Sequence, residues 1–158
     1  MTRQCIVRER IVRVMGAWET GSGVLEFPDG RRVRGRGLRG SIEEGDPEFG
    51  IYLQDRDPCI DTWPNRWVHW PDFALPASTN DAVAAMREAY DRASSERVEI
   101  ACGAGIGRTG SALSVLAVMC GVDADAAVAW VREHYHRGAV ETEQQRRWVS
   151  EVAASLAR

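Results

Sequence analysis

The sequence predicts an α/β fold in a single domain, and three observations lead to this prediction. Its 158 residues are enough for one domain with a proper hydrophobic core and too few for two comfortable ones. Its composition, 44% hydrophobic and 27% charged residues, is that of an ordinary soluble globular protein. Strand-like segments and segments of helical periodicity both occur along the chain, so we expect both kinds of element.

Several segments near the start of the chain have the pattern of strands. Residues 5–14 alternate loosely between apolar and polar, which predicts a first strand. Residues 24–27 and 31–34 flank the turn Pro28-Asp29-Gly30 and predict a hairpin. Residues 50–53 predict another short strand, which a polar turn follows.

A concentration of positive charge overlaps the predicted hairpin, because residues 31–39 contain five arginines among nine residues. Such a segment could form a basic lip that attracts an acidic substrate. An acidic cluster follows at once, however, at Glu43, Glu44, Asp46 and Glu48. We therefore expect a solvated hairpin whose charges this cluster balances.

The middle of the chain predicts a packing segment, a helix and a strand. Trp63 and Trp67 belong to an aromatic stretch that ends in a loop, and we expect them to act in packing. Ser78 or Thr79 caps a helix that extends to about residue 93. Residues 98–101 form an apolar run that predicts the central strand.

Three helices are predicted after this strand. The helix that follows Thr109 is apolar nearly all round, which predicts that it is buried. Asp123 is expected to cap the next helix. The last helix begins within residues 140–145 and has an apolar stripe formed by Trp148, Val149, Val152 and Leu156.

The stretch from Ile100 to Gly110 has the arrangement strand, glycine-rich loop, helix, which binds anions through loop amides and the positive helix end. Gly103, Gly105 and Gly107 allow the tight loop conformation. Arg108 can bind two oxygens of one phosphate. The positive field favours the nucleophilic thiolate of Cys102. We therefore predict phosphate binding by the residues of the loop: Gly103, Ala104, Gly105, Ile106, Gly107 and Arg108.

A second stretch, Trp70-Pro71-Asp72-Phe73-Ala74-Leu75-Pro76, contains two prolines and is predicted to be a loop. A thiolate that attacks phosphorus needs an acid to protonate the departing oxygen. A carboxylic acid on a mobile loop can supply that proton. Alone, Asp72 would be read as a turn residue, but beside a phosphate-binding loop we expect it to be the acid.

The spacing of Cys102, five residues and Arg108 resembles the signature loop of the cysteine-dependent protein tyrosine and dual-specificity phosphatases. The Trp70-Pro71-Asp72 loop is similar to the acid loop of the tyrosine-specific enzymes. Residues 140–145 are similar to the family's glutamine loop, with Glu141 in place of its first glutamine. The resemblance implies a mostly parallel central sheet flanked by helices, with residues 1–158 as one phosphatase domain: N-terminal strands and a hairpin in 1–60, and the catalytic motifs in 61–158.

The resemblance also implies roles for these residues. Cys102 is the nucleophile, Asp72 is the acid and then the base, and Thr109 supports departure of the thiolate. For Gln145 two interpretations remain open, and both can hold: it positions the water that hydrolyses the phosphocysteine, or it forms a capping box with Thr142. No metal and no cofactor are needed. The expected substrate is a phosphorylated protein or a small phosphomonoester.

Two departures from the family bear on this prediction. The family usually has histidine before the cysteine, whereas Ala101 stands here, so one contribution that favours the thiolate is missing. A phosphotyrosine-clamping loop is not identifiable in the first 60 residues. The choice between phosphotyrosine alone and phosphotyrosine with phosphoserine and phosphothreonine therefore stays open. Gly103 and Ile106 stand where phosphoinositide phosphatases tend to have lysines, which favours a singly phosphorylated substrate.

Other classes of function fit less well. A catalytically silent module that binds a phosphorylated partner is supported only by Ala101, and a rhodanese-like sulfurtransferase has no use for Asp72. The net charge of −3 gives no reason to expect nucleic acid, and the longest apolar run, residues 112–120, is too short to span a membrane. Four cysteines without metal-like spacing and without a secretory signal predict the cytoplasm. The exclusive use of arginine over lysine hints at a bacterial source, and the sequence does not indicate an oligomeric state.

Overall fold

The computed structural model describes residues 17–40 and 45–158, so the strand predicted at residues 5–14 lies outside the described residues. Five strands form one sheet in the described part of the chain. They are β1 (Val24–Glu26), β2 (Arg32–Gly37), β3 (Phe49–Gln54), β4 (Asn65–His69) and β5 (Val98–Cys102). The predicted hairpin is confirmed as β1 and β2, which pair in antiparallel fashion.

The strand order is β1-β2-β5-β3-β4, and every pairing except that of β1 with β2 is parallel. β5 therefore lies at the centre, where all five of its residues are buried. Its last residue, Cys102, lies opposite Gly37 at the end of β2. This mostly parallel sheet confirms the predicted fold class, and it places the cysteine at the carboxyl end of the central strand.

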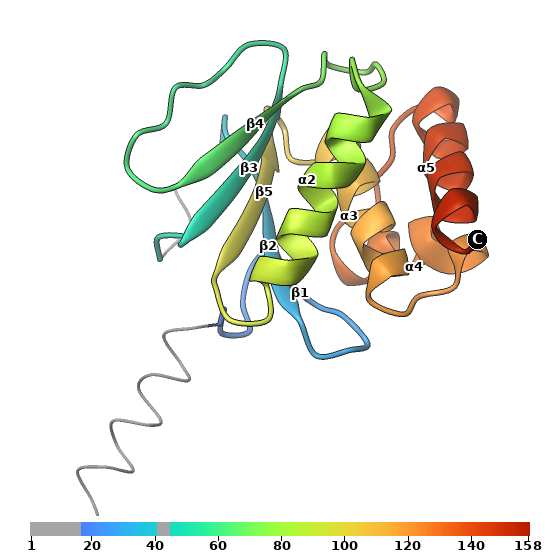
Figure 1. Ribbon diagram of the computed structural model, residues 1–158, viewed down its shortest axis with the longest axis horizontal. Coiled ribbons are helices and arrows are strands. Elements are labelled where there is room, and N and C mark those ends of the chain that lie inside the picture. Colours follow the sequence, from blue (N-terminus) through green and yellow to red (C-terminus); the bar gives the residue numbers. More distant parts are fainter. Residues whose placement is uncertain (1–16, 41–44) are drawn as a thin grey trace, which may run out of the picture.

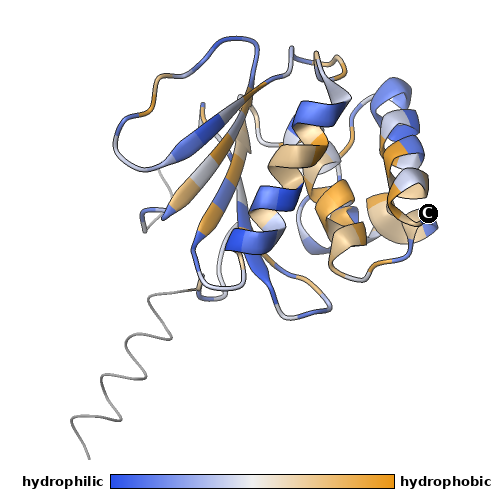
Figure 2. Cartoon of the chain, viewed as in Figure 1, coloured by the Kyte–Doolittle hydropathy of each residue, from blue (hydrophilic) through white to orange (hydrophobic). Residues whose placement is uncertain are grey.

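The described helices gather on one face of the sheet (Figure 1). They are α2 (Thr79–Arg92), α3 (Gly107–Met119), the short 3₁₀ helix η1 (Ala124–Ala126), α4 (Ala127–His134) and α5 (Glu143–Leu156). α3 contacts the other three α-helices as well as β5 and β2. Because neighbours surround it, nearly all of α3 is buried, as its apolar sequence predicts, and Figure 2 colours much of α3 as hydrophobic.

Helix termini follow the predicted capping residues in two cases and depart from them in one. Ser78 caps α2 by accepting a hydrogen bond from the Asp81 amide, as predicted. Thr142 and Gln145 form the predicted capping box of α5. Asp123 makes no side-chain cap, because the chain first forms η1 and α4 begins only at Ala127. The cap predicted at Asp123 is therefore wrong.

The sequence pattern does not predict β4, because it indicates an aromatic stretch that ends in a loop at these residues. Only Val68 of its five residues is fully buried, because β4 is an edge strand with one neighbour, β3. Its alternation is correspondingly weak, and the parallel pairing with β3 decides its conformation. Trp67 is 37% exposed there, so it is not a core residue.

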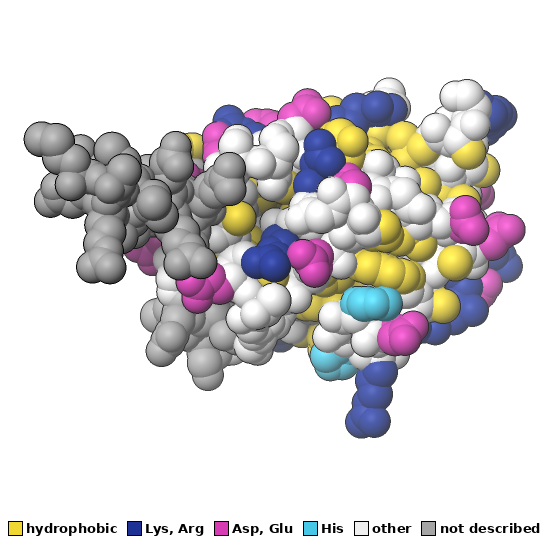
Figure 3. All heavy atoms as spheres, turned by 90° about the horizontal axis from the view of Figure 1, so that it is seen from below, with side chains coloured by type: hydrophobic (Ala, Val, Ile, Leu, Met, Phe, Trp, Pro, Cys, Tyr) yellow, Lys and Arg dark blue, Asp and Glu magenta, His cyan; other side chains and the backbone are white. Residues whose placement is uncertain are grey.

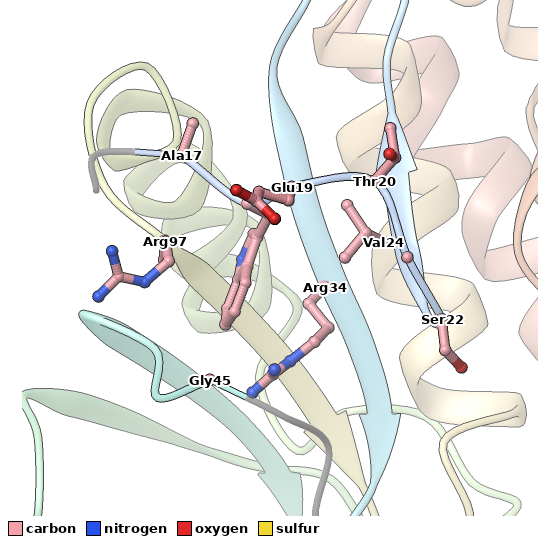
Figure 4. Close-up of a pocket in the computed structure, with 10 residues that line it drawn as sticks. Ala17, Glu19, Thr20, Ser22, Val24, Arg34, Gly45 and Arg97 are labelled. Carbon is pink, nitrogen blue, oxygen red and sulfur yellow. The ribbon is translucent and has the colours of Figure 1, made fainter. Parts of the chain in front are cut away.

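A buried ionic cluster occupies the sheet face away from the helices. Glu99 is fully buried and accepts hydrogen bonds from Arg34 Nη2 at 2.8 Å, Arg36 Nε at 2.6 Å and the Tyr52 hydroxyl at 3.0 Å. Burial raises the pKa of Tyr52, which keeps its hydroxyl a donor. Trp18 packs on the Arg34 guanidinium at 4.0 Å, beside a hollow of about 530 Å³ in which Figure 4 shows Arg34 and Arg97. Two strands are thus tied to β5 by its central carboxylate.

Four of the five arginines of residues 31–39 pair with carboxylates outside the predicted acidic cluster. Arg34 and Arg36 bind Glu99, Arg31 pairs with Asp29, and Arg32 pairs with Glu26. Glu48 pairs with Arg97, and Glu43 and Glu44 lie outside the described residues. Sheet pairing brings Glu99 and the hairpin acids to these arginines, and their balance by the acidic cluster as a whole stays a prediction.

The surface mixes charges of both signs. Figure 3 shows one face, where the described acidic, basic and hydrophobic side chains are interspersed. In residues 17–40 and 45–158, no helix has the length and apolarity needed to span a membrane. The described part of this face presents no single patch of one charge.

Replacing Glu99 tests the buried ionic cluster. Glu99→Gln leaves two arginine side chains facing a neutral amide, and we expect a loss of about 3–5 kcal/mol in the free energy of unfolding. Glu26→Gln is the matched control, because the Glu26–Arg32 pair also joins two strands but its carboxylate is 56% exposed, so we expect a loss below about 1 kcal/mol. Urea unfolding measures both values. Equal losses would contradict the assignment of Glu99 as a structural anchor.

Candidate active site

The loop between β5 and α3 presents uncapped backbone amides. α3 begins at Gly107, its N-cap residue Ile106 makes no side-chain hydrogen bond, and its first turn contains no acidic residue. The N–H groups of that turn therefore have no side-chain acceptor, and the positive end of the helix dipole points toward the loop. An anion held in the loop would satisfy both, as the sequence predicts for residues 103–108.

Cys102 lies at the base of this loop and is 1% exposed. Its Sγ accepts a hydrogen bond from the backbone N–H of Gly105 at 3.2 Å. Gly105 has a φ of +77°, and a Cβ there would lie 2.4 Å from the backbone nitrogen of Gly37. Glycine is thus required at position 105 both for its conformation and for the close approach of β2. The sulfur therefore already accepts one hydrogen bond from a loop amide.

The carbonyl groups of the loop bind to the surrounding scaffold. The Leu38 amide donates to the Cys102 carbonyl at 2.8 Å, and the Arg39 amide donates to the Gly103 carbonyl at 3.0 Å. The Tyr135 hydroxyl donates to the Gly105 carbonyl at 2.6 Å. With these carbonyls bound on the outside, the loop is preorganised to use its N–H groups toward a ligand.

Arg108 connects the loop to two other segments, as a buried side chain that is only 4% exposed. Its Nη1 donates to the carbonyls of Leu53 and Trp70, each at 3.1 Å. Its Nη2 lies 3.3 Å from Oδ1 of Asp72. Its Nε is buried and has no hydrogen-bond partner. One guanidinium is thus fixed by the scaffold along one edge and keeps its Nε available for an oxygen ligand.

Asp72 reaches the loop because the residues around it are anchored. Trp70 is fully buried, donates from Nε1 to the Ala74 carbonyl at 2.8 Å, and packs edge-on against Trp148 at 5.0 Å. Asp72 itself is 46% exposed at the side chain. The following residue, Phe73, has a φ of +58° and is 58% exposed. The two predicted motifs, 30 residues apart in sequence, therefore meet in one cleft.

Thr109 and Gln145 lie buried beside the loop. Gln145 Oε1 accepts from the amides of Glu141 at 2.9 Å and Thr142 at 3.3 Å, which completes the capping box. Gln145 Nε2 and Thr109 Oγ1 are buried without a hydrogen-bond partner. The structural interpretation of Gln145 therefore holds, and its amide nitrogen is still free for a second role.

Three further residues border the site and were not predicted to belong to it. The Glu141 carboxylate lies against Gly107, where a Cβ would come within contact of its Oε1. Tyr135 holds the loop through Gly105, and its ring occupies the space beside Gly35. Arg39 lines the cleft. The run of arginines in the sequence could have indicated that Arg39 belongs to the site, whereas no local sequence pattern distinguishes Tyr135 from a core residue.

The cleft over the loop has a volume of about 460 Å³. Charged side chains dominate its walls, with Arg39, Arg56 and Arg108 outnumbering Asp55 and Asp72. A net positive wall suits an anionic ligand. Asp55 is also engaged outside the loop, since its Oδ1 lies 3.2 Å from Nε2 of His69.

The other described cysteines have different surroundings. Burial raises the pKa of Cys120 to about 12, so it remains a neutral thiol in the core. Cys59 is exposed on the loop after β3. Among the residues that the structure describes, no three or more His, Cys, Asp or Glu side chains group closely enough to hold a metal ion. Of the described cysteines, Cys102 is the one that accepts a hydrogen bond from a loop amide and lies beside the loop that contains Arg108.

The comparisons with known proteins identify one family and include two structures of one similar protein. Residues 54–155 match the protein-tyrosine phosphatase family. The structure of Tk-PTP in its active form is similar, with 22% identity, a TM-score of 0.68, and coverage of 85% of this chain and 99% of that one. A mutant form of Tk-PTP is 23% identical, with a TM-score of 0.65 and coverage of 84% and 96%. At these identities the likeness shows the fold alone. No curated protein sequence matches.

Gly37 tests whether the fixed loop geometry controls anion binding. A Cβ at Gly37 would lie 2.6 Å from the Ala104 carbonyl oxygen, so Gly37→Ala must displace the loop backbone. We expect oxyanion affinity to fall by about tenfold or more, since overpacking costs about 1–3 kcal/mol. Gly40→Ala is the control, because its Cβ meets only the Gly37 carbonyl oxygen at 3.6 Å. Tungstate titration by calorimetry measures both, and similar affinities in the two variants would contradict this account.

Proposed function

Because this chain belongs to the protein-tyrosine phosphatase family, we propose that it hydrolyses phosphomonoesters on proteins through a phosphocysteine intermediate, without a metal ion. We propose residues 1–158 as one catalytic domain. Phosphotyrosine is the first candidate substrate, and phosphoserine and phosphothreonine are the second. The loop amides and Arg108 supply the positive charge that a metal ion provides in other phosphatases.

The observation that carries this proposal is the set of buried polar atoms without partners. In the described residues these are Arg108 Nε, Thr109 Oγ1 and Gln145 Nε2, all three from residues that the sequence assigns to the site. An unpaired buried polar group costs about 1–3 kcal/mol, so native structures contain few of them. Their clustering around one loop supports a site whose hydrogen bonds are completed by ligand.

The first step forms a phosphorus–sulfur bond. The Cys102 thiolate attacks phosphorus while the bond from phosphorus to the substrate oxygen breaks, and Asp72 donates a proton to that oxygen. Arg108 binds two non-bridging oxygens through Nε and Nη2, since its Nη1 is occupied by the Leu53 and Trp70 carbonyls. Asp72 needs little movement for this role, because its carboxylate already lies 3.3 Å from Arg108.

The second step returns the enzyme to its starting state. Water attacks phosphorus, the phosphorus–sulfur bond breaks, and the Asp72 carboxylate accepts the proton that the water loses. Thr109 Oγ1 can donate to the departing thiolate, because it is buried beside the loop with no other partner. Gln145 Nε2 can donate to the attacking water, while its Oε1 remains in the cap of α5.

Replacing the nucleophile tests the covalent mechanism. We expect Cys102→Ser to abolish hydrolysis of an aryl phosphate in the presence of a chelator, because an alcohol is a far weaker nucleophile at neutral pH. Tungstate binding should persist, since the amides and Arg108 are unchanged. Cys59→Ser is the matched control and should keep full activity, because Cys59 is exposed outside the cleft. Retained turnover in Cys102→Ser would overturn the mechanism, and absent turnover in the unmodified chain would favour a phosphate-recognition module.

Replacing the acid tests the role of Asp72. Phosphotyrosine leaves as a phenolate whose conjugate acid has a pKa of about 10, whereas a nitrophenolate is a much weaker base. We expect Asp72→Ala to lower kcat on a phosphotyrosine peptide by about 10²–10⁴-fold, and by clearly less on nitrophenyl phosphate. Asp61→Ala, an exposed carboxylate that is not among the residues lining the cleft, is the control. Equal losses on both substrates would assign the proton transfer to another carboxylate.

A further inference from the structure

Two arginine side chains at the mouth of the cleft make no hydrogen bond to another described residue. Arg39 and Arg56 both line the cleft, and neither guanidinium makes a hydrogen bond within residues 17–40 and 45–158. The other arginines of the 31–39 segment differ, since each donates a hydrogen bond to a carboxylate. The one ion pair of Arg39 is with Asp72 at 3.8 Å, which is longer than a hydrogen bond. Neither guanidinium is therefore needed to neutralise a carboxylate that stabilises the fold.

Arg39 lies directly beside the phosphate loop. The position that a Cβ would take on Gly103 is 2.7 Å from Arg39 Nη2 and 3.2 Å from Arg108 Nη2. The two guanidinium groups therefore flank the same point above the first residue of the loop. Arg39 is fixed at its backbone, where its amide donates to the Gly103 carbonyl. Its side chain remains 68% exposed, so it can receive a group that arrives from solvent.

We propose that Arg39, together with Arg56, forms a second anion-binding subsite, which selects phosphopeptides that carry an acidic side chain next to the phosphorylated residue. The inference rests on the proposed function and names its substrate class. Arg108 is occupied by the phosphoryl group in that mechanism, so a second negative charge on the same substrate meets Arg39. A guanidinium binds a carboxylate through two parallel hydrogen bonds, which gives geometry as well as attraction.

The size of the preference follows from the exposure of Arg39. Exposed ion pairs contribute little to affinity, and a bidentate arginine–carboxylate pair lies at the upper end of their range. We therefore expect the acidic peptide to be preferred by about three- to fivefold in kcat/KM at low salt. The preference should shrink as ionic strength rises, because the screening length falls to about 3 Å at 1 M salt.

The experiment compares two phosphotyrosine peptides that differ only in glutamate or glutamine on each side of the phosphotyrosine. The enzymes are the unmodified chain, Arg39→Gln, Arg39→Lys, Arg56→Gln and the control Arg87→Gln. Arg87 is exposed on α2 and is not among the residues that line the cleft. We expect Arg39→Gln to lower kcat/KM for the glutamate peptide more than for the glutamine peptide, so that their ratio falls toward one. Arg56→Gln should lower the ratio in part, Arg39→Lys should keep part of it, and Arg87→Gln should keep all of it.

Two results would overturn the subsite. One is a ratio that Arg39→Gln leaves unchanged. The other is an equal loss on both peptides, which would mean that Arg39 acts by positioning Asp72. A doubly phosphorylated peptide is tested as well. If the enzyme prefers it over the glutamate peptide, the subsite binds phosphate rather than carboxylate, which contradicts the proposal.

Failure of the proposed function gives a different result from failure of the subsite. If the unmodified chain hydrolyses neither peptide, binding of both peptides to Cys102→Ser is measured by fluorescence anisotropy, with and without Arg39→Gln. A preference for the glutamate peptide that depends on Arg39 would support the subsite without catalysis. Equal affinities for the two peptides would reject it.

Discussion

The site depends on the position of one buried guanidinium. Arg108 holds the carbonyls of Leu53 and Trp70 through a single nitrogen, and so ties together the phosphate loop, the end of β3 and the start of the acid loop. Removing Arg108 would deprive the Trp70 carbonyl of its donor, which is costly, whereas the Leu53 carbonyl also accepts from Gln54 Nε2 at 2.9 Å. The same contacts leave Arg108 Nε as the unpaired donor. One edge of the planar guanidinium therefore holds the fold together, and the other edge is available for the proposed binding of phosphate.

The sheet supports this arrangement from its other face. Glu99 lies three residues before Cys102 on β5, and its carboxylate joins β2 and β3 to the central strand through Arg34, Arg36 and Tyr52. A one-residue slip of β5 would turn this charge toward the apolar helix side, which is prohibitively unfavourable. The buried cluster thereby fixes the register of β5, and with it the depth at which the cysteine meets the loop.

Structural and functional hydrogen bonds share side chains around the loop. Gln145 caps α5 through its carbonyl oxygen while its amide nitrogen has no partner, so the capping box and the proposed water-binding role do not compete. Tyr135 is similar, because its ring fills the space beside Gly35 while its hydroxyl holds the loop at Gly105. Such double use explains how a small sheet and its helices on one face can hold a site of many precise contacts.

The sequence alone determined the strand–loop–helix at residues 98–119, the hairpin, and the caps of α2 and α5, because local chemistry decides them. Each depends on neighbouring residues or on a motif of fixed spacing. Tertiary structure decided what depends on distant pairing: β4 as an edge strand, Glu99 as the partner of two arginines, and Tyr135 at the loop. It also decided that Arg39 lies at the cleft, 3.8 Å from Asp72, because the partners of a charge depend on which chain segments fold beside it.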